Sequence, residues 1–434
     1  MRHTIRPLTV SLAVLFFVAF PSFAQKASNP TSFRVFLDCS FMCDTSFIKE
    51  ALPIVDWVNE RTQADLHVLH ASQRTGSGGE QITLTFIGQR NFVALTDTLS
   101  YATGAGATSD ENREDLLHHL TIGLARYLVR AGLSDKLTIG AVRPMPGVAQ
   151  QASIEKDPWN YWVFSISANG SLDGQETTRF ARRRASFSAN RTTEALKMSF
   201  SGNINESTSE FDVGDETIKN ETQSERLSAQ IVRSIGEKWA VGGTGFMSGS
   251  TFSNSKRIYQ GGPAVEYNFF PYTQSTRKYL TMQYGVQLSR RYYEELTIFA
   301  LDEETVLTHS LDLSMSLNQP WGNVSFSADA THLLTNFDRS LTDSYRLGLF
   351  AYGNVRLFRG LSFNTFASYS RIRDQIDLPG EAATREEILL RSTQLPTGYS
   401  FQVNFGFTYR FGSLFNNVVN PRMGGGGGGM VIMM

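Results

Sequence analysis

One stretch near the end of the chain limits the folds open to it more than any other. Residues 401–411 read Phe-Gln-Val-Asn-Phe-Gly-Phe-Thr-Tyr-Arg-Phe, so every second side chain is large and apolar. Successive side chains of a strand point to opposite faces, so the stretch predicts a strand with one apolar face and one polar face. Strands of soluble sandwiches also alternate, but five aromatic residues on one face are typical of a surface that meets lipid.

The end of this stretch carries a short motif. Asn404, Gly406, Tyr409 and Phe411 follow the order polar, any, Gly, two spacers, aromatic, any, aromatic. The motif resembles the carboxy-terminal signal by which the barrel-assembly machinery of bacterial outer membranes recognises its clients. That resemblance implies an outer-membrane β-barrel protein with outer-membrane lipid and the assembly machinery as partners.

Alternation of the same kind recurs throughout residues 159–411. Leu280, Met282, Tyr284 and Val286, for example, share one face of an expected strand. The pattern predicts an all-β transmembrane antiparallel barrel of about twelve strands, an even number as bacterial single-chain barrels have. A soluble β-sandwich is the alternative, but it would leave serines, asparagines and glycines outside.

The connections between these strands alternate in length. Short and long alternation is typical of periplasmic turns and extracellular loops, and would put both termini in the periplasm. Expected short connections are residues 191–195, 236–238, 271–278, 319–323 and 359–360; expected long ones are residues 206–223, 249–257, 290–304, 335–344 and 372–398.

The start of the chain reads as a targeting segment. Residues 1–24 combine Arg2 and Arg6, an apolar run and a small-residue ending, which predicts a secretory signal peptide cut before Gln25. No later apolar run reaches the ~18 residues of a membrane-spanning helix. Without the leader the formal charge changes from -1 to -3, because two arginines are lost. So balanced a chain offers no electrostatic support for nucleic-acid binding.

Residues 25–137 have the pattern of a small α/β domain. Expected elements are strands at 33–37, 65–71, 81–88 and 96–101, and helices at 45–61 and 110–131, with a glycine-rich hairpin turn at 74–79. This order resembles the periplasmic α/β domains of the Tol-system propeller protein and of the curli secretion channel. The resemblance implies a periplasmic protein partner. Residues 138–158, rich in proline, then predict a linker.

Two cysteines stand close together in this domain. In an exported chain Cys39 and Cys43 are candidates for a disulfide, but the ring would be small and the free thiols remain an alternative. We expect no metal site, because two thiols without a histidine nearby in the sequence supply too few ligands. His118 and His119 are helical neighbours that point about 100° apart, which is unsuitable for a metal pair.

The barrel segment contains two histidines. His309 is in phase with the lipid-facing positions, and His332 falls near the rim; Glu303, Glu304 or Asp338 could approach either. This pattern is too general to predict a catalytic site or a cofactor. The leading hypothesis is therefore a non-enzymatic protein, with a barrel hydrolase acting on lipid or surface polymer as the alternative.

Charged side chains on the other face are candidates for the barrel interior: Arg182, Arg184, Glu266, Asp312, Asp329, Arg346, Arg356 and Arg410. They would either pair and plug the interior or line a selective channel. The sequence thus predicts a small pore or, equally, a platform that recruits periplasmic partners for transport or assembly. Residues 412–434 form a glycine-rich tail, which is either an appendage or a tether with an apolar tip that docks.

Overall fold

The structure is a computed structural model that describes residues 33–39, 43–76, 78–104, 106–137, 157–337, 343–381, 383–390 and 392–413. The expected signal peptide, most of the linker and most of the tail lie outside these residues. Among the described residues, no helix is both long and apolar enough to cross a bilayer.

The amino-terminal unit is a five-stranded sheet covered by helices. Its strands are β1 (Arg34–Asp38), β2 (Asp56–Trp57), β3 (Leu66–Arg74), β4 (Glu80–Gly88) and β5 (Thr96–Thr103), in the order β2-β1-β3-β4-β5. Strand β1 is parallel to β2 and β3, whereas β3, β4 and β5 are antiparallel neighbours. The helices are α1 (Thr45–Ala51) and α2 (Ser109–Arg130), with 3₁₀ turns at Arg61–Gln63, Arg90–Phe92 and Ser134–Lys136. The expected α/β fold of this part is confirmed.

Helix α2 supplies much of this unit's core. It begins with a capping box, in which the Thr108 hydroxyl accepts from the Glu111 N–H and the Glu111 carboxylate accepts from the Thr108 N–H. Leu120 and Leu124 are buried against the sheet. The hydroxyl of Tyr127, also buried, donates to the main-chain oxygen of Phe86 at 3.0 Å, so the helix is fixed to β4 by both packing and a hydrogen bond.

The expected helix at 45–61 was wrong beyond its first two turns. Asp44 caps the start of this helix, accepting from the Phe47 N–H, but α1 ends at Ala51. Pro53 explains the end, because proline has no N–H to donate and the residue before it disfavours helical geometry. Trp57 is buried in the core from strand β2, so the apolar periodicity there reflects burial and not a continued helix.

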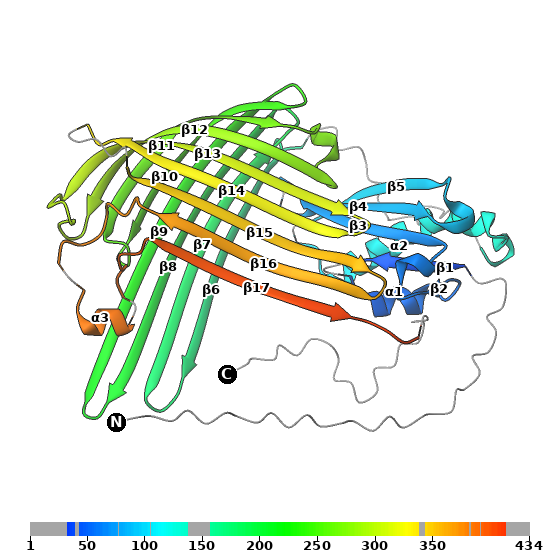
Figure 1. Ribbon diagram of the computed structural model, residues 1–434, viewed down its shortest axis with the longest axis horizontal. Coiled ribbons are helices and arrows are strands. Elements are labelled where there is room, and N and C mark those ends of the chain that lie inside the picture. Colours follow the sequence, from blue (N-terminus) through cyan, green and yellow to red (C-terminus); the bar gives the residue numbers. More distant parts are fainter. Residues whose placement is uncertain are drawn as a thin grey trace, which may run out of the picture. The chain divides into compact units, whose positions relative to one another are not determined.

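The rest of the described chain is a twelve-stranded antiparallel sheet in which each strand pairs with its neighbours in sequence (Figure 1). The strands are β6 (Trp162–Gly174), β7 (Thr178–Thr192), β8 (Leu196–Val213), β9 (Glu216–Ile235), β10 (Trp239–Ser250), β11 (Ser255–Asn268), β12 (Lys278–Tyr293), β13 (Glu303–Gln319), β14 (Gly322–Thr335), β15 (Tyr345–Phe358), β16 (Leu361–Ile372) and β17 (Tyr399–Tyr409). One further 3₁₀ turn, Tyr272–Gln274, precedes β12, and a short helix, α3 (Arg385–Leu390), lies between β16 and β17.

This sheet confirms the expected β-barrel fold and its strand number. The sheet curves, and its first and last strands are β6 and β17; among the described residues no pairing joins those two. The predicted apolar face is also confirmed, since Phe401, Val403, Phe405 and Phe407 on β17 are all more than half exposed. We call this the outer face and the opposite one the inner face.

The two ends of the sheet differ in their connections. One end, called the turn end, has the connections 193–195, 236–238, 269–277, 320–321 and 359–360. The other, called the cap end, has the connections 175–177, 214–215, 251–254, 294–302, 336–344 and 373–398. Short connections therefore fall where the alternation predicted them.

Two expected long loops were wrong, because the connections 214–215 and 251–254 are as short as those of the turn end, so the strict alternation of short and long connections does not hold. Residues 206–223 are mostly strand, because β8 and β9 continue to a hairpin whose turn holds Gly214 at φ 65°, a conformation that glycine adopts readily. The polar residues that suggested a loop are cross-strand ion pairs on the outer face, such as Arg183 with Glu206 at 3.1 Å. Residues 249–257 and 290–304 likewise contain more strand than expected.

Candidate functional site: the polar inner face of the barrel

Hydroxyl and amide side chains are frequent on the inner face, which also carries an aromatic pair, Phe350 with Phe366. Ser167 on β6 and Ser186 on β7 are hydrogen-bonded at 2.7 Å, and Ser201 on β8 bonds Ser228 on β9 at 2.8 Å. These contacts satisfy polar groups across neighbouring strands, as an interior that meets water or a polar solute requires. The face is therefore polar because the alternation puts small hydroxyl residues there.

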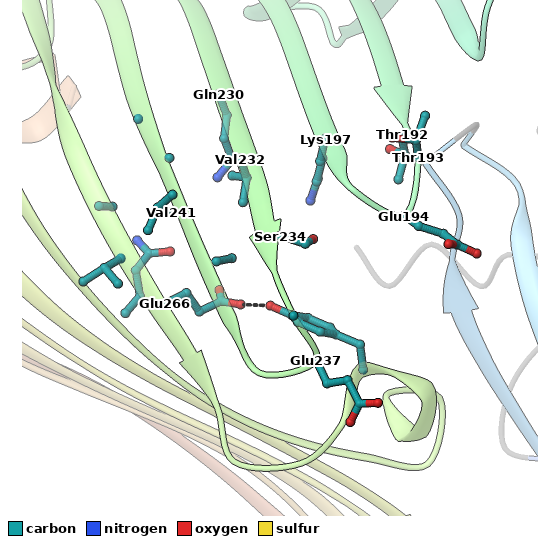
Figure 2. Close-up of a pocket in the computed structure, with 18 of the residues that line it drawn as sticks. Thr192, Thr193, Glu194, Lys197, Gln230, Val232, Ser234, Glu237, Val241 and Glu266 are labelled. Atoms are coloured by element: carbon teal, nitrogen blue, oxygen red, sulfur yellow. Dashed lines mark hydrogen bonds between the residues drawn. The ribbon is translucent and has the colours of Figure 1, made fainter.

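A cavity of about 730 Å³ lies at the turn end of this face. Figure 2 shows that Lys197 and Gln230 enter it from β8 and β9, with Glu266 on β11 across from them. The Glu266 carboxylate accepts a hydrogen bond from the Tyr272 hydroxyl at 2.7 Å, which fixes its position. The cavity thus offers a cationic and an anionic group on opposite parts of its wall.

The two signs of charge occupy different strands of the inner face. The alternation places Arg182 and Arg184 on β7, together with Lys197, on the same face as the serines. Arg226 on β9 also lies there, with its guanidinium 3.9 Å from the Phe246 ring. The acidic side chains come from β11, β13 and β14: Glu266, Asp312 and Asp329. The interior wall therefore has a basic sector on β7–β9 and an acidic sector on β11–β14, which Arg291 on β12 interrupts near the cap end.

Two of the predicted carboxylates face each other. Asp312 on β13 and Asp329 on β14 are directly paired across the strands, and the Ser310 hydroxyl lies 3.3 Å from Asp312. The next strand leaves room for them, because a Cβ at Gly348 would collide with the Asp329 carboxylate. Like charges placed opposite one another cost free energy, so this pair is a candidate for contact with a cation or a dipolar solute.

The remaining predicted interior charges are accounted for differently. Arg346 forms a two-pronged contact with Asp374 of the 373–398 connection, with an N–O distance of 3.0 Å. Arg356 donates to the Pro320 main-chain oxygen at the turn end. Arg410 lies just beyond β17, and its N–H donates to the Gly360 oxygen. These three arginines belong to the two ends of the sheet and not to the middle of its wall.

Three connections at the cap end bond to one another. Residues 294–302 and 373–398 meet at an antiparallel bridge between Thr297 and Pro379, supported by an Ile298 N–H to Leu378 oxygen bond of 2.9 Å. The buried Asn254 side chain joins both: its Nδ2 donates to the main-chain oxygens of Glu295 and Asp377, each at 3.1 Å. We call this assembly the cap.

An apolar contact anchors the cap to the inner face. Val306 on β13, Leu333 on β14 and Ile376 of the cap are buried together. Beside them the Glu304 carboxylate accepts from the Tyr293 hydroxyl at 2.5 Å and from the Asn336 amide at 3.2 Å. Buried apolar contacts and hydrogen bonds thus fix the cap to the inner face at one end of the sheet.

The candidate histidines lie on the outer face. The Tyr284 hydroxyl is 3.2 Å from His309 Nδ1, and His309 Nε2 is 3.1 Å from His332 Nδ1. Both ring nitrogens of His309 are therefore engaged by these neighbours. The arrangement does not give His309 a free nitrogen to act as the base for a nucleophile.

Several residues of this site were missed by the sequence reasoning. Lys197 and Arg226 are in phase with the predicted inner positions, so the alternation that found Arg182 could have found them. Asn254 carried no signal, because its role depends on two connections far along the chain. The motif residues Asn404, Gly406 and Tyr409 lie on β17, and Phe411 follows it; their role in assembly stays a prediction.

Comparison with known proteins yields only distant likenesses. No protein-family model matches the chain, and no curated protein matches its sequence. The NanC porin superposes with 7% identity over 57% of this chain and 99% of that one, at a TM-score of 0.27. The translocator domain of the autotransporter NalP from Neisseria meningitidis superposes with 16% identity over 58% of this chain and 82% of that one, at a TM-score of 0.19. CdiB from Acinetobacter baumannii superposes with 10% identity over 79% of this chain and 59% of that one, at a TM-score of 0.28. The expected resemblance of the amino-terminal unit to the Tol and curli domains is not tested by these comparisons and stays a prediction.

Proposed function

We propose that this protein is an integral outer-membrane barrel that acts as a gated pore for small polar or charged solutes. The observation that carries the proposal is the inner face itself. Its serine ladders, its cavity and its separate basic and acidic sectors are suited to a hydrated path and serve no purpose in an apolar core.

The outer face supports insertion in a membrane. Its exposed side chains along the strands are large and apolar, including Ile166, Phe187 and Leu227. Toward the cap end the same columns change to ion pairs, such as Arg183 with Glu206 and Arg257 with Glu225. A band of apolar side chains that ends in charged pairs matches a hydrocarbon layer bounded by water.

The proposed orientation puts the turn end in the periplasm and the cap outside the cell. Short turns on the periplasmic side and longer connections outside are the usual arrangement in bacterial barrels. The amino-terminal α/β unit, the predicted linker and the predicted tail would then be periplasmic, as the sequence analysis expects.

Planar-bilayer recording tests the pore directly. The purified mature chain, added in detergent to a lipid bilayer, should give discrete conductance steps that prefer one ion sign. A matched variant, Lys197→Glu, should shift the reversal potential toward cations, whereas Lys256→Glu, a charge outside the cavity lining, should not. If the wild-type chain inserts and yet conducts nothing under any voltage, the proposal of a pore is wrong.

A second role, as a platform for a periplasmic protein, has one observation in its favour. Strand β5 is an edge of its sheet, and Thr96, Thr98, Ser100 and Ala102 are exposed along it. Unpaired edges bind added strands from partners, and lysines placed on them prevent this. Pull-down with the full chain and with Thr98→Lys/Ser100→Lys tests it: equal recovery of every co-purifying protein would count against this role.

The hydrolase alternative gains no support from the histidines. His309 is bonded through both nitrogens and faces outward. A lipase assay on His309→Ala/His332→Ala decides the point, since activity that persisted unchanged in this variant would exclude both as the catalytic base.

A further inference from the structure

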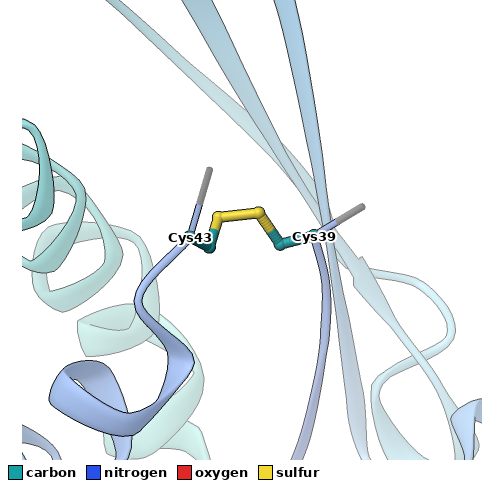
Figure 3. Close-up of a disulfide and its surroundings, with 2 residues drawn as sticks. All are labelled: Cys39 and Cys43. Atoms are coloured by element: carbon teal, nitrogen blue, oxygen red, sulfur yellow. A yellow bond between two sulfur atoms is a disulfide. The ribbon is translucent and has the colours of Figure 1, made fainter. Parts of the chain in front are cut away.

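The disulfide of the amino-terminal unit has a histidine beside it. A bond joins Cys39, just after β1, to Cys43, just before α1, with their Cα atoms 6.2 Å apart (Figure 3). In the parallel pair of β1 and β3, Asp38 is opposite Leu69, so the following residues Cys39 and His70 are brought side by side. The cysteine sulfurs and a ring nitrogen of His70 all lie within 4.8 Å of one another.

We propose that the reduced form of this unit binds a thiophilic d¹⁰ cation, Zn²⁺ or Cu⁺, through Cys39, Cys43 and His70. Two thiolates and one imidazole are the ligands that these ions prefer among protein side chains. We expected no metal here because no histidine is close to the cysteines in the sequence; the register of β1 and β3 supplies one. The proposal is independent of whether the barrel conducts.

The geometry can accommodate such an ion after small movements. Zinc–sulfur bonds of about 2.3 Å in a tetrahedron separate two thiolates by about 3.8 Å, so the sulfurs must move apart by about 2 Å once their bond is opened. The ring that the disulfide closes is short, and short rings gain little stability from loop closure. We therefore expect the fold to survive opening of the bond. Cys39 and Cys43 then stay next to β1 and α1, and His70 stays on β3.

A cavity lies next to His70. It has a volume of about 200 Å³, and its lining includes His70, Glu80, Tyr101 and Asn112. A tetrahedral site with three protein ligands keeps a fourth position for water or another donor. The cavity is polar on this side and can hold that fourth ligand, with Glu80 as a charge that favours a cation.

Binding of the ion takes two steps, reduction of the disulfide and then ligation. A dithiol reductant exchanges with the Cys39–Cys43 bond, so that the reductant becomes a disulfide and the protein gains two thiols. Both thiols then lose a proton as the ion binds, and the neutral His70 ring donates a nitrogen lone pair. The oxidised form has no thiolate to offer, so binding and the disulfide exclude each other.

The test uses the mature full chain in detergent, reduced with a phosphine under argon and then freed of it. Co²⁺ serves as the spectroscopic probe, because thiolate ligation gives charge-transfer absorption, and Zn²⁺ then competes for the site; Cu⁺ is titrated separately against a chromophoric chelator. We expect one-to-one binding of at least one of these ions by the reduced chain and none by the oxidised chain. Which ion binds more tightly identifies the occupant.

Matched variants assign the ligands. We expect His70→Ala to weaken binding at least about tenfold, as loss of a ligand should, and Cys39→Ser/Cys43→Ser to abolish it. His118→Ala, an exposed histidine on α2, and His309→Ala/His332→Ala, the outer-face pair, should bind as wild type does. If His70→Ala loses its circular dichroism signal, His70→Asn replaces it. Equal affinity of the reduced wild type and a folded His70 variant would overturn the proposal, as would binding by the oxidised chain.

Discussion

The side-chain amide of Asn254 lies 3.1 Å from the main-chain oxygen of Asp377, a residue 123 positions further along the chain. Asn254 has φ 49°, a left-handed conformation that asparagine tolerates better than most residues. It is also almost fully buried, so its hydrogen bonds cannot be replaced easily by water. One side chain thus links all three connections of the cap.

The first prediction removes this side chain. In Asn254→Ala the main-chain oxygens of Glu295 and Asp377 lose the amide that donates to them, which should cost the cap about 1–3 kcal/mol. We expect a higher single-channel conductance or a larger open fraction in planar bilayers, with little change in heat stability of the barrel. Thr251→Ala is the matched control, because Thr251 lies in the same connection but bonds Gln223 of the neighbouring strand. Equal gating in both variants would argue against the cap as a gate.

The second prediction concerns the pH dependence of the cap. Burial is the main cause that raises the pKa of Asp377 above its usual 3.8, and Asp374 adds to it, whereas Arg291, Arg346 and a main-chain hydrogen bond act in the opposite direction. A carboxyl with a raised folded-state pKa stabilises the closed cap most fully below 3.8, and that stability is lost as the pH rises through the raised value. Acidification should therefore close the cap and lower conductance.

The variant that checks this is Asp377→Asn, which is neutral at every pH and should lose the acid response while staying closed. Asp302→Asn, an exposed carboxyl in the 294–302 connection, should keep the wild-type response. Conductance measured across a pH series on all three chains decides it, and a response that survives in Asp377→Asn would show that another group is responsible.

The barrel could be predicted from its sequence because a two-residue period needs no long-range information. The apolar β17 positions from Phe401 to Phe407 reveal the outer face by their own chemistry, and Gln402 and Asn404 between them reveal the inner face. The helix predicted at 45–61 was too long for two reasons. The buried apolar residues in β2 and next to it in sequence follow no clear period, and the effect of Pro53 was overlooked.

The parts that could not be predicted depend on contacts between distant residues. The long hairpin of β8 and β9 has polar residues that pair with a neighbouring strand, such as Glu206 with Arg183 on β7, and a single segment does not reveal such pairs. The cap and the cluster of Cys39, Cys43 and His70 likewise follow from register and loop packing. Such sites become visible only when the strands are placed side by side.

The third prediction concerns ion preference. Asp312 and Asp329 face each other in the acidic sector, so Asp312→Asn/Asp329→Asn removes negative charge from the path. A unit charge about 4 Å away changes an ion's free energy by about 1 kcal/mol in water, which is roughly a fivefold change in relative permeability. We expect the reversal potential in a salt gradient to shift toward anions by that order.

Its control is Asp212→Asn, a carboxyl on the β8 extension that pairs with Arg179 on the outer face. This variant should keep the wild-type reversal potential. High salt should reduce the effect of the double variant, because mobile ions screen charges that line water. No shift at any ionic strength would place the two carboxyls outside the conducting path.

The fourth prediction is that β6 and β17 pair to close the sheet in the membrane. They run in opposite directions in an even-numbered antiparallel series, so closure makes an antiparallel pair and removes two unpaired edges. Cysteines introduced on the inner face of β6 should therefore oxidise to a bond with cysteines on β17 in a Cys39→Ser/Cys43→Ser background. Suitable inner positions are Ser165, Ser167 and Asn169 on one strand and Gln402, Asn404 and Thr408 on the other.

The variants are oxidised in outer-membrane vesicles. The readout is the mobility of each variant on a denaturing gel, run on samples that are neither boiled nor reduced. Ser368→Cys with Gln402→Cys is the positive control, because those residues are directly paired between β16 and β17. Ile166→Cys with Gln402→Cys is the negative control, since Ile166 lies on the outer face and is 88% exposed. At least one inner pair should crosslink as fully as the positive control, because a closed wall holds the two edges at the spacing of neighbouring strands. If the positive control forms its bond and every β6–β17 pair stays reduced, the sheet is open in the membrane and its edges must be covered by something else.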